Sequence, residues 1–310
     1  MRLRKFGLIT TITFGIILLA IIRVKLKNDT YIEVYNKNIN FNVDAESCVV
    51  MDANTKEILY QNNPHKKLLP ASITKILTCI TALELYPIDD YVYIDYDMIN
   101  TIGSRIYLKI GDYIKVEDLL YGLMLNSGND AAKALALHYS KVEEDFIKQM
   151  NKLAKKIGMV NSVFKNSSGL DNETSNITTA YDMAILTSYS LNNDNFIKFF
   201  STKKYYTKLD DRTLYYHHKH RLVQNYDFVL GGKTGYTERA GRTLVTVFEE
   251  GDKRIIVVTF NSHNDWQIHL NFGRHFLYGK NDDVIDTISN IVMFKPYKPF
   301  CERLKVVKDD

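Results

Sequence analysis

The sequence predicts an α+β fold in which both ends of the chain supply strands to one antiparallel sheet, with a helical lobe inserted between them. Strand-like patterns fill residues 46–61 and return at residues 228–260. Between residues 70 and 200, apolar residues recur mostly at the three-and-four spacing of helices. A last amphipathic segment, roughly residues 265–278, is expected to cover one face of the sheet.

Composition sets limits on function. The 310 residues carry 40 basic and 36 acidic side chains, a net charge of +4, so we expect no nucleic-acid partner, which would need a concentrated basic face. Three cysteines are too few and too scattered for a disulfide framework or a zinc site. A pair between Cys48 and Cys301 stays open. We expect no metal and no cofactor.

The N-terminus predicts a membrane segment. Residues 1–23 contain an uncharged run from Phe6 to Ile22 behind a basic tip, which fits a membrane anchor or a secretion signal. We favour an uncleaved anchor, because no small-residue cleavage pattern follows Ala20. The protein would then lie outside the cytoplasm on a tether of residues 24–44, or be secreted if the segment is cleaved. A domain at residues 45–279 and a short extension at 280–310 complete the chain.

The first strands are expected at residues 47–51 and 57–61, as a hairpin that leads into the central helix. That helix should start at Pro70, which suits a first turn, and end before Pro87. Ser72 and Lys75 lie three residues apart and so share one side of its first turn. A serine needs a neighbouring base to act as a nucleophile, and a lysine serves only if its pKa is lowered.

A second set of polar residues lies in a predicted turn between two helices of the lobe. A helix at residues 118–125 ends at a Ser-Gly-Asn corner, and another starts at residue 130. Ser127 and Asn129 should point the same way from this turn. Further helices are expected at residues 146–157, closed by Gly158, and from a cap at Thr178 or Thr179 to residue 191.

A third polar group lies on a late strand. Residues 228–230 lead into Lys233, Thr234 and Gly235, and a hairpin of residues 243–249 and 254–260 follows. An ammonium and a hydroxyl side by side can hold a carboxylate, while the glycine lets a substrate lie against the backbone.

The three groups occur in the order Ser-x-x-Lys, Ser-x-Asn, Lys-Thr-Gly, and closely similar triplets mark the penicillin-binding proteins and class A β-lactamases. With residues 49–52, 69–75, 125–132, 164–171, 232–237 and 240–241, the chain resembles the D-alanyl-D-alanine carboxypeptidases, the low-molecular-mass penicillin-binding proteins. The similarity covers roughly residues 45–278. It implies the family's fold, in which the active site lies between an antiparallel sheet and a helical lobe.

The resemblance also implies roles for the polar residues. Ser72 would be the acylated nucleophile, Lys75 its general base, and Ser127 the relay of a proton to the leaving D-alanine. Water would then hydrolyse the acyl-enzyme. The substrate would be the peptidoglycan stem peptide, and β-lactam antibiotics would be covalent inhibitors.

The remaining positions would bind this substrate. Asn129 would hydrogen-bond the peptide backbone, while Lys233 and Thr234, followed by Gly235, would bind the terminal carboxylate. The backbone N–H groups of Ser72 and Tyr236 would form the oxyanion hole.

Two features depart from the family. Asparagines are usual where this chain has a basic, histidine-rich run from His217 to Arg221, which we interpret as a basic cluster at the cleft edge, able to contact anionic wall polymer. The C-terminal β-domain of many members is largely missing, so the N-terminal segment would supply the tether.

Three other functions remain open. A class A β-lactamase needs a glutamate with an asparagine four residues on, whereas Glu173 is followed by Ile177, which favours a peptidase. A D,D-endopeptidase would use the same triplet to cut peptide cross-links. A wall-binding module with a silent site is the non-enzymatic alternative.

Overall fold

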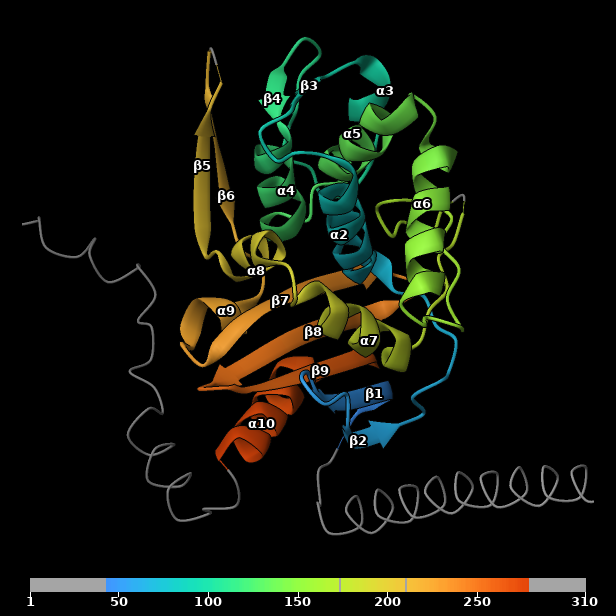
Figure 1. Cartoon of the computed structure of the whole chain (residues 1–310), viewed down its shortest axis with the longest axis vertical. Coiled ribbons are helices and arrows are strands. Elements are labelled where there is room, and N and C mark those ends of the chain that lie inside the picture. Colours follow the sequence, from blue (N-terminus) through green and yellow to red (C-terminus); the bar gives the residue numbers. More distant parts are fainter. Residues whose placement is uncertain (1–42, 173, 210, 279–310) are drawn as a thin grey trace, which may run out of the picture. The chain divides into compact units, whose positions relative to one another are not determined.

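The computed structural model describes residues 43–278, apart from residues 173 and 210 (Figure 1). The expected anchor at residues 1–23, nearly all of the 24–44 tether and the 280–310 extension lie outside these residues, as do Glu173 and Cys301. In the part that the structure describes, no helix has the length and apolar character needed to cross a membrane.

The core of the fold is a five-stranded antiparallel sheet, which confirms the predicted α+β class. In spatial order its strands are β2 (Ile58–Asn62), β1 (Ala45–Asp52), β9 (Lys253–Ser262), β8 (Gly241–Glu250) and β7 (Val229–Thr237). Strands from the two ends of the described chain therefore pair directly, with Val50 of β1 opposite Val257 of β9. Strand β7 lies at the edge of the sheet.

Helices from the middle of the chain form the inserted lobe on one face of this sheet, and α10 covers the other face (Figure 1). The lobe contains η1 (Ala71–Thr74), α2 (Lys75–Leu85), α3 (Tyr96–Ile99), α4 (Val116–Leu125), α5 (Asn129–Ser140), α6 (Glu143–Lys156), α7 (Ala180–Ser190) and α8 (Asp194–Ser201). Helix α9 (Arg221–Asn225) precedes β7, and α10 spans Asp265–Tyr278. Thr179 caps α7, since its side chain accepts the amide of Asp182.

The strands bury both faces. Val49 and Met51 of β1 pack in the main core under the helical lobe, whereas Cys48 and Val50 pack in a second core under α10. This alternation follows from the two-residue period of a strand. Cys48 and Cys79 are both buried free thiols.

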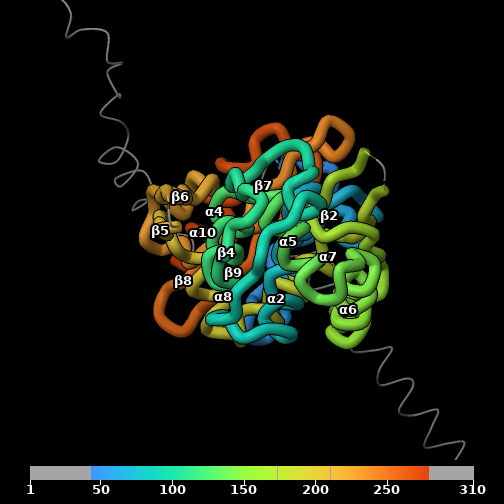
Figure 2. The backbone as a smooth tube through the Cα atoms, turned by 90° about the horizontal axis from the view of Figure 1, so that it is seen from above, coloured from blue at the N-terminus to red at the C-terminus, as the bar shows by residue number. Residues whose placement is uncertain are grey.

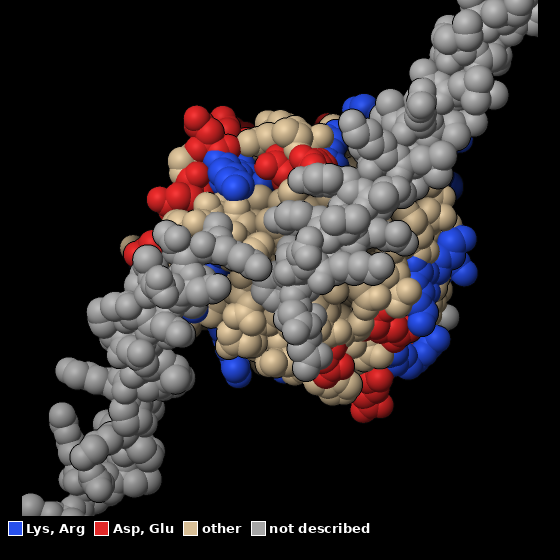
Figure 3. Space-filling view, turned by 90° about the horizontal axis from the view of Figure 1, so that it is seen from below, with Lys and Arg blue, Asp and Glu red and all other residues tan. Residues whose placement is uncertain are grey.

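Two small ribbons were not predicted as such. They are β3 (Tyr91–Tyr93) with β4 (Tyr113–Lys115), and β5 (Lys204–Lys208) with β6 (Thr213–His217). Seen from above, β5 and β6 lie beside α4 at one side of the helical lobe, and α6 lies at the opposite side (Figure 2). On the face seen from below, acidic and basic side chains that are visible lie intermixed (Figure 3), in keeping with the small net charge.

A chain of buried polar side chains joins the sheet to α10 and α9. His220 Nδ1 accepts the amide of Val223, so Nε2 donates to Thr246 Oγ1 at 2.9 Å. Thr246 Oγ1 in turn donates to His269 Nδ1 at 2.7 Å, and His269 Nε2 donates to Thr259 Oγ1 at 2.9 Å. Each ring is thereby held neutral, and burial lowers the pKa of His269 to about 3.

These neutral histidines predict acid sensitivity. Burial also lowers the pKa of His218 to about 4 and that of His220 well below 6.5. As the pH falls below about 6.5, the unfolded chain gains protons that the folded chain does not, so stability is lost. The melting temperature should fall between pH 6.5 and pH 5, above the range in which most carboxyl groups titrate, and His269→Gln should flatten this slope. A melting temperature independent of pH in this range would contradict the assignment.

Candidate active site

The predicted nucleophile lies in the turn that opens the central helix. Ser72 belongs to the 3₁₀ turn η1, and the α-helix α2 starts only at Lys75. The sequence placed Ser72 in the first turn of a helix, and the structure shows that this first turn is a 3₁₀ turn. With three residues per turn, a 3₁₀ turn places residues three apart on one line. Lys75 Nζ accordingly lies 2.9 Å from Ser72 Oγ.

The amine of Lys75 has no solvent contact. It donates to Asn129 Oδ1 at 2.8 Å and to the carbonyl of Ser168 at 2.6 Å. Burial, reinforced by the charge of Lys219 and opposed by Asp130, lowers the pKa of Lys75 to about 7. A substantial fraction of the amine is therefore uncharged near neutral pH, as a general base requires.

The second predicted group lies in the turn between α4 and α5. Ser127 Oγ accepts a hydrogen bond of 2.9 Å from Lys233 Nζ, and Asn129 Nδ2 donates to the carbonyl of Ile102 at 2.7 Å. The left-handed residue of this turn is Ser127, with φ of 60°, whereas Gly128 has φ of −60°. A serine held in this region is strained, a condition found most often at functional sites.

The third group lies on β7, beside the other two. Lys233 is buried, donates also to the carbonyl of Thr234 at 2.9 Å, and has a pKa held well below its usual value by burial, Lys75 and Lys219. Gly235 is needed for close approach to the nucleophile turn: a Cβ at this position would lie 2.9 Å from the amide nitrogen of Ser72. The structure shows that the glycine admits the Ser72 turn, and because Gly235 also lines the cleft, its role in admitting the substrate stays a prediction.

These residues surround a cleft of about 450 Å³ between the sheet and the helical lobe. Its walls are formed by Ser72, Ser104, Ser127, Lys219, Thr234, Gly235, Tyr236, Arg242, Thr243, Asp265 and Trp266. Lys75 and Lys233 lie behind this wall and contact it through Ser72 and Ser127, and Asn129 in turn contacts Lys75. All eight predicted site residues therefore converge, and Tyr236 stands exposed at the mouth.

Several residues of the cleft wall were not predicted from the sequence. Arg242 holds Asp265 through two hydrogen bonds of 3.0 and 2.6 Å, and its guanidinium lies 5.8 Å from the ring of Trp266. Ser104 accepts from Lys219 Nζ at 2.9 Å. No motif marks these positions, and the sole sequence signal is that Trp266 is the single tryptophan of the chain.

The His217–Arg221 run is not the uniform basic edge that the sequence suggested. His218 and His220 are buried and bonded within the protein, while His217, Lys219 and Arg221 are exposed. The strand-like alternation of this segment separates the two sets. Lys219 alone reaches the cleft wall, so the interpretation as a cleft-edge cluster holds for one side chain of the run.

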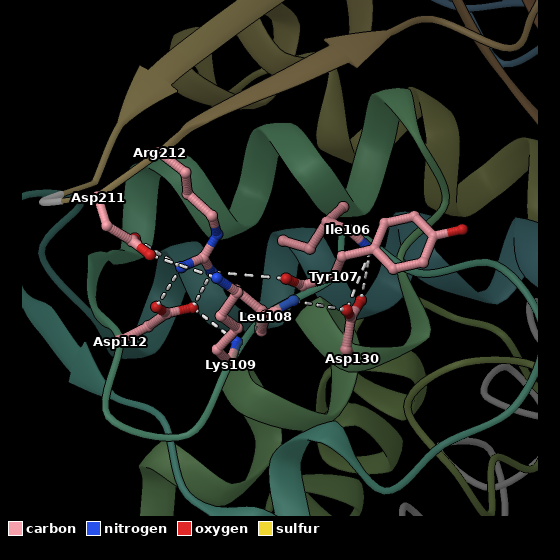
Figure 4. Close-up of polar contacts among 8 residues, drawn as sticks. All are labelled: Ile106, Tyr107, Leu108, Lys109, Asp112, Asp130, Asp211 and Arg212. Carbon is pink, nitrogen blue, oxygen red and sulfur yellow. Dashed lines mark hydrogen bonds and ion pairs between the residues drawn. The ribbon is translucent and has the colours of Figure 1, made fainter.

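The segment of residues 106–112, which follows Ser104, is held from two sides (Figure 4). The buried carboxylate of Asp130 accepts the amides of Ile106 at 2.9 Å and Leu108 at 3.3 Å. From the other side, Arg212 at the tip of the β5–β6 ribbon makes a two-pronged pair with Asp112, at 2.9 and 2.5 Å. The ribbon thus fixes one wall of the cleft at a distance from the reacting groups.

Comparison with known proteins agrees with this geometry. The sequence profile of the D-alanyl-D-alanine carboxypeptidases matches residues 33–264. The chain belongs to the D-alanyl-D-alanine carboxypeptidase family. The carboxypeptidase DacF of Bacillus subtilis is 36% identical over 225 residues, which cover 71% of this chain and 58% of the relative. The carboxypeptidase DacC of Escherichia coli is 34% identical over 235 residues, which cover 72% of this chain and 58% of the relative.

Solved structures give the same family fold. A mutant of a Streptomyces DD-transpeptidase superposes with a TM-score of 0.72 at 28% identity, covering 77% of this chain and 99% of the other. The three carboxypeptidase motifs all lie within the matched residues. The chain spans 58% of the length of both curated carboxypeptidases named above.

The unusual pKa of Lys75 can be measured directly. An NMR titration of isotope-labelled lysine side chains should find one amine that titrates near pH 7. Lys219→Gln should raise this pKa, because it removes a like charge. Lys204→Gln, on the exposed side of β5, is the matched control and should leave it unchanged. A Lys75 pKa near 10.5 would contradict the burial argument.

The ion pair between Arg212 and Asp112 should contribute more to stability than the neighbouring pair between Lys109 and Asp211. Arg212→Ala should lower the free energy of unfolding by roughly 1–3 kcal/mol, because it leaves the nearly buried Asp112 unpaired. Lys109→Ala removes the exposed pair with Asp211 and should cost less than about 1 kcal/mol. Denaturant titration measures both, and equal losses would show that the Arg212–Asp112 pair does not hold this wall.

Proposed function

We propose that this protein is a serine-type D-alanyl-D-alanine carboxypeptidase that removes the terminal D-alanine from peptidoglycan stem peptides through an acyl-enzyme. One observation carries the proposal. A buried amine whose pKa is about 7 lies 2.9 Å from a serine hydroxyl at the wall of a cleft. A serine nucleophile and its base require this arrangement.

Acylation follows from the positions of these groups. Lys75 takes the proton of Ser72 as Oγ attacks the carbonyl carbon of the scissile bond. Negative charge then develops on the carbonyl oxygen, toward which the N–H groups of Ser72 and Tyr236 would donate. The closeness of Gly235 to the Ser72 amide supports this pairing, because it brings the two backbones together.

Collapse of the intermediate breaks the C–N bond and needs a proton for the leaving amine. Ser127 would deliver it, and its hydrogen bond from Lys233 Nζ supports a shared path. Thr234 and Lys233 would hold the carboxylate of the leaving D-alanine. Asn129 uses one amide hydrogen on Ile102, so its second hydrogen can bond the peptide. Water then releases the shortened peptide.

The same nucleophile would be acylated by β-lactams. A D,D-endopeptidase acting on cross-links is the enzymatic alternative, because it would use the same groups on a longer leaving group. For location, the apolar N-terminal run supports a protein anchored on the outer side of the membrane, or secreted if the run is cleaved.

Replacement of the nucleophile tests the proposal. Intact-mass measurement should find one penicillin adduct on the wild-type chain, and Ser72→Ala should lose both the adduct and D-alanine release, the latter by more than about 10³-fold. Ser140→Ala, an exposed serine at the end of α5, is the control and should retain both. An adduct that survives Ser72→Ala would overturn the assignment.

Substrate products separate the alternatives. Mass analysis of digested muropeptides should show pentapeptides becoming tetrapeptides, whereas loss of cross-linked dimers would favour the endopeptidase. Fast, repeated turnover of a chromogenic cephalosporin would instead identify a β-lactamase. Absence of any labelling in a folded protein would support a silent binding module.

A further inference from the structure

Exposed aromatic side chains gather at one end of the helical lobe. The exposed tyrosines of this region are Tyr91, Tyr93, Tyr96, Tyr107 and Tyr113. None of them lines the catalytic cleft. Rings left in water contribute nothing to the core, and clustered exposed apolar surface is typical of an interaction site.

Three of these tyrosines share one face of the β3–β4 ribbon. Val92 and Ile114, which lie opposite each other, are buried in the main core. Because strand side chains alternate between the two faces, the residues beside them point to solvent. The exposed fractions are 44% for Tyr91, 59% for Tyr93 and 62% for Tyr113. We call these three residues the tyrosine patch.

The rings of the tyrosine patch are already arranged for a ligand. Tyr93 lies opposite Tyr113 in the register of the ribbon. The ring centroids of Tyr91 and Tyr113 are 4.7 Å apart, and the two planes are inclined by only 13°. Lys115 Nζ lies 5.7 Å from the centroid of the Tyr91 ring. Strand pairing fixes these positions, so little ordering is needed when a flat ligand covers the rings.

The chemistry of the tyrosine patch limits what can cover it. Within the part of the chain that the structure describes, the three phenol hydroxyls form no hydrogen bond with the protein. A purely apolar partner would bury these hydroxyls unpaired, which costs free energy. A sugar ring has an apolar C–H face that can lie on an aromatic ring and hydroxyls that can bond the phenols. A carbohydrate therefore fits both parts of the surface.

The charges around the tyrosine patch disfavour an anionic partner. Asp89 and Asp90 directly precede β3, and Asp95 and Asp97 closely follow it. Within the two strands, Lys115 is the single cationic residue. A phosphate polymer or an anionic lipid surface would meet this acidic surround with repulsion. An uncharged sugar chain would not.

The position of the ribbon leaves it free to bind a polymer. Strands β3 and β4 lie at the upper end of the domain, whereas β1, β2 and α10 lie at the lower end (Figure 1). The described chain begins at residue 43, just before β1, so an N-terminal tether joins the domain far from the tyrosine patch. Helix α4 starts directly after β4 and ends at the catalytic turn, about 15 Å away. A polymer on the patch therefore does not block the cleft.

We propose that the tyrosine patch binds the uncharged glycan strand of the cell wall by stacking amino-sugar rings on Tyr91, Tyr93 and Tyr113. The inference goes beyond the proposed function, because it assigns a site that holds the wall apart from the site that cuts the peptide. The glycan carries the stem peptide, so the two ligands reach the protein together. Binding at the patch would keep the cleft close to successive peptides of one strand.

Sedimentation tests the proposal without turnover. The full chain with Ser72→Ala should bind insoluble peptidoglycan and also chitin, an uncharged polymer of N-acetylglucosamine that carries no peptide. On this background, Tyr93→Thr combined with Tyr113→Thr should weaken binding to both polymers on the order of tenfold, because two rings are lost. Threonine suits a strand, so the ribbon should keep its fold. Unchanged binding of this double variant would overturn the proposal.

The other ribbon offers a matched control. Tyr206 and Tyr215 are also exposed and directly opposite each other, on β5 and β6. Their ring centroids are 6.2 Å apart, and Lys204 and Lys208 flank Tyr206 along its strand. Tyr206→Thr combined with Tyr215→Thr should retain binding to chitin. An equal loss in both double variants would contradict the assignment to β3–β4. Binding to peptidoglycan without binding to chitin would also contradict it, because the peptide would then be the ligand.

A ligand titration without patch variants gives an independent answer. In the full chain with Ser72→Ala and isotope-labelled tyrosine rings, a soluble N-acetylglucosamine oligomer should shift the NMR signals of Tyr91, Tyr93 and Tyr113. The signals of Tyr206 and Tyr215 should stay in place. Patch signals that do not move at saturating oligomer would overturn the proposal.

Activity separates this proposal from the proposed function. With Ser72 present, the Tyr93→Thr, Tyr113→Thr variant should release D-alanine several-fold more slowly from insoluble peptidoglycan, but at the wild-type rate from a soluble pentapeptide. Equal losses on both substrates would show that the variant acts on the cleft and would contradict a separate glycan site. If the wild-type chain releases no D-alanine at all, the proposed function is wrong, and sedimentation and NMR still decide the glycan proposal.

Discussion

A lysine amine kept out of water against a serine hydroxyl is the constraint on which the rest of this structure depends. An ammonium without solvent is costly, and further cations close by add to that cost. Lys75 meets both conditions, because it is fully buried and Lys219 contributes repulsion. The protein tolerates this since the ammonium donates to Asn129, Ser168 and Ser72, whereas the neutral amine can keep the first two bonds and accept the hydroxyl hydrogen of Ser72.

The backbone around this amine includes non-glycine residues with positive φ, a region that such residues rarely adopt. Ala71, which precedes Ser72, and Ser127 itself both have positive φ, 48° and 60°. The backbone of Ala71 is packed closely against Gly169, because a Cβ on Gly169 would lie 1.9 Å from the carbonyl oxygen of Ala71. Such strain persists only where the surroundings fix it. The site is therefore set before a substrate arrives.

Sequence reasoning recovered the parts of the fold that repeat along the chain. The helical spacing after Lys75 and the amphipathic run to Tyr278 were local patterns, and the structure confirms both elements. The convergence of the three motifs could be expected, because the sequence places them in the first turn of a helix, in a turn between two helices and on a late strand. By contrast, Trp266 and Ser104 reach the cleft through tertiary packing, which leaves no periodic trace. The alternation of buried and exposed residues from His217 to Arg221 was hidden because histidine suits either environment.

The strand order carries a consequence for how the molecule is made. Strand β9, which ends at Ser262, lies between β1 and β8, so the N-terminal hairpin has no partner until nearly the whole domain has been synthesised. Pairing over such sequence separations is slow, and the unpaired edges meanwhile invite aggregation. The helical lobe can collapse earlier from local contacts. The cleft between the two layers would thus be among the last features to form during biogenesis, when the terminal strands finally meet.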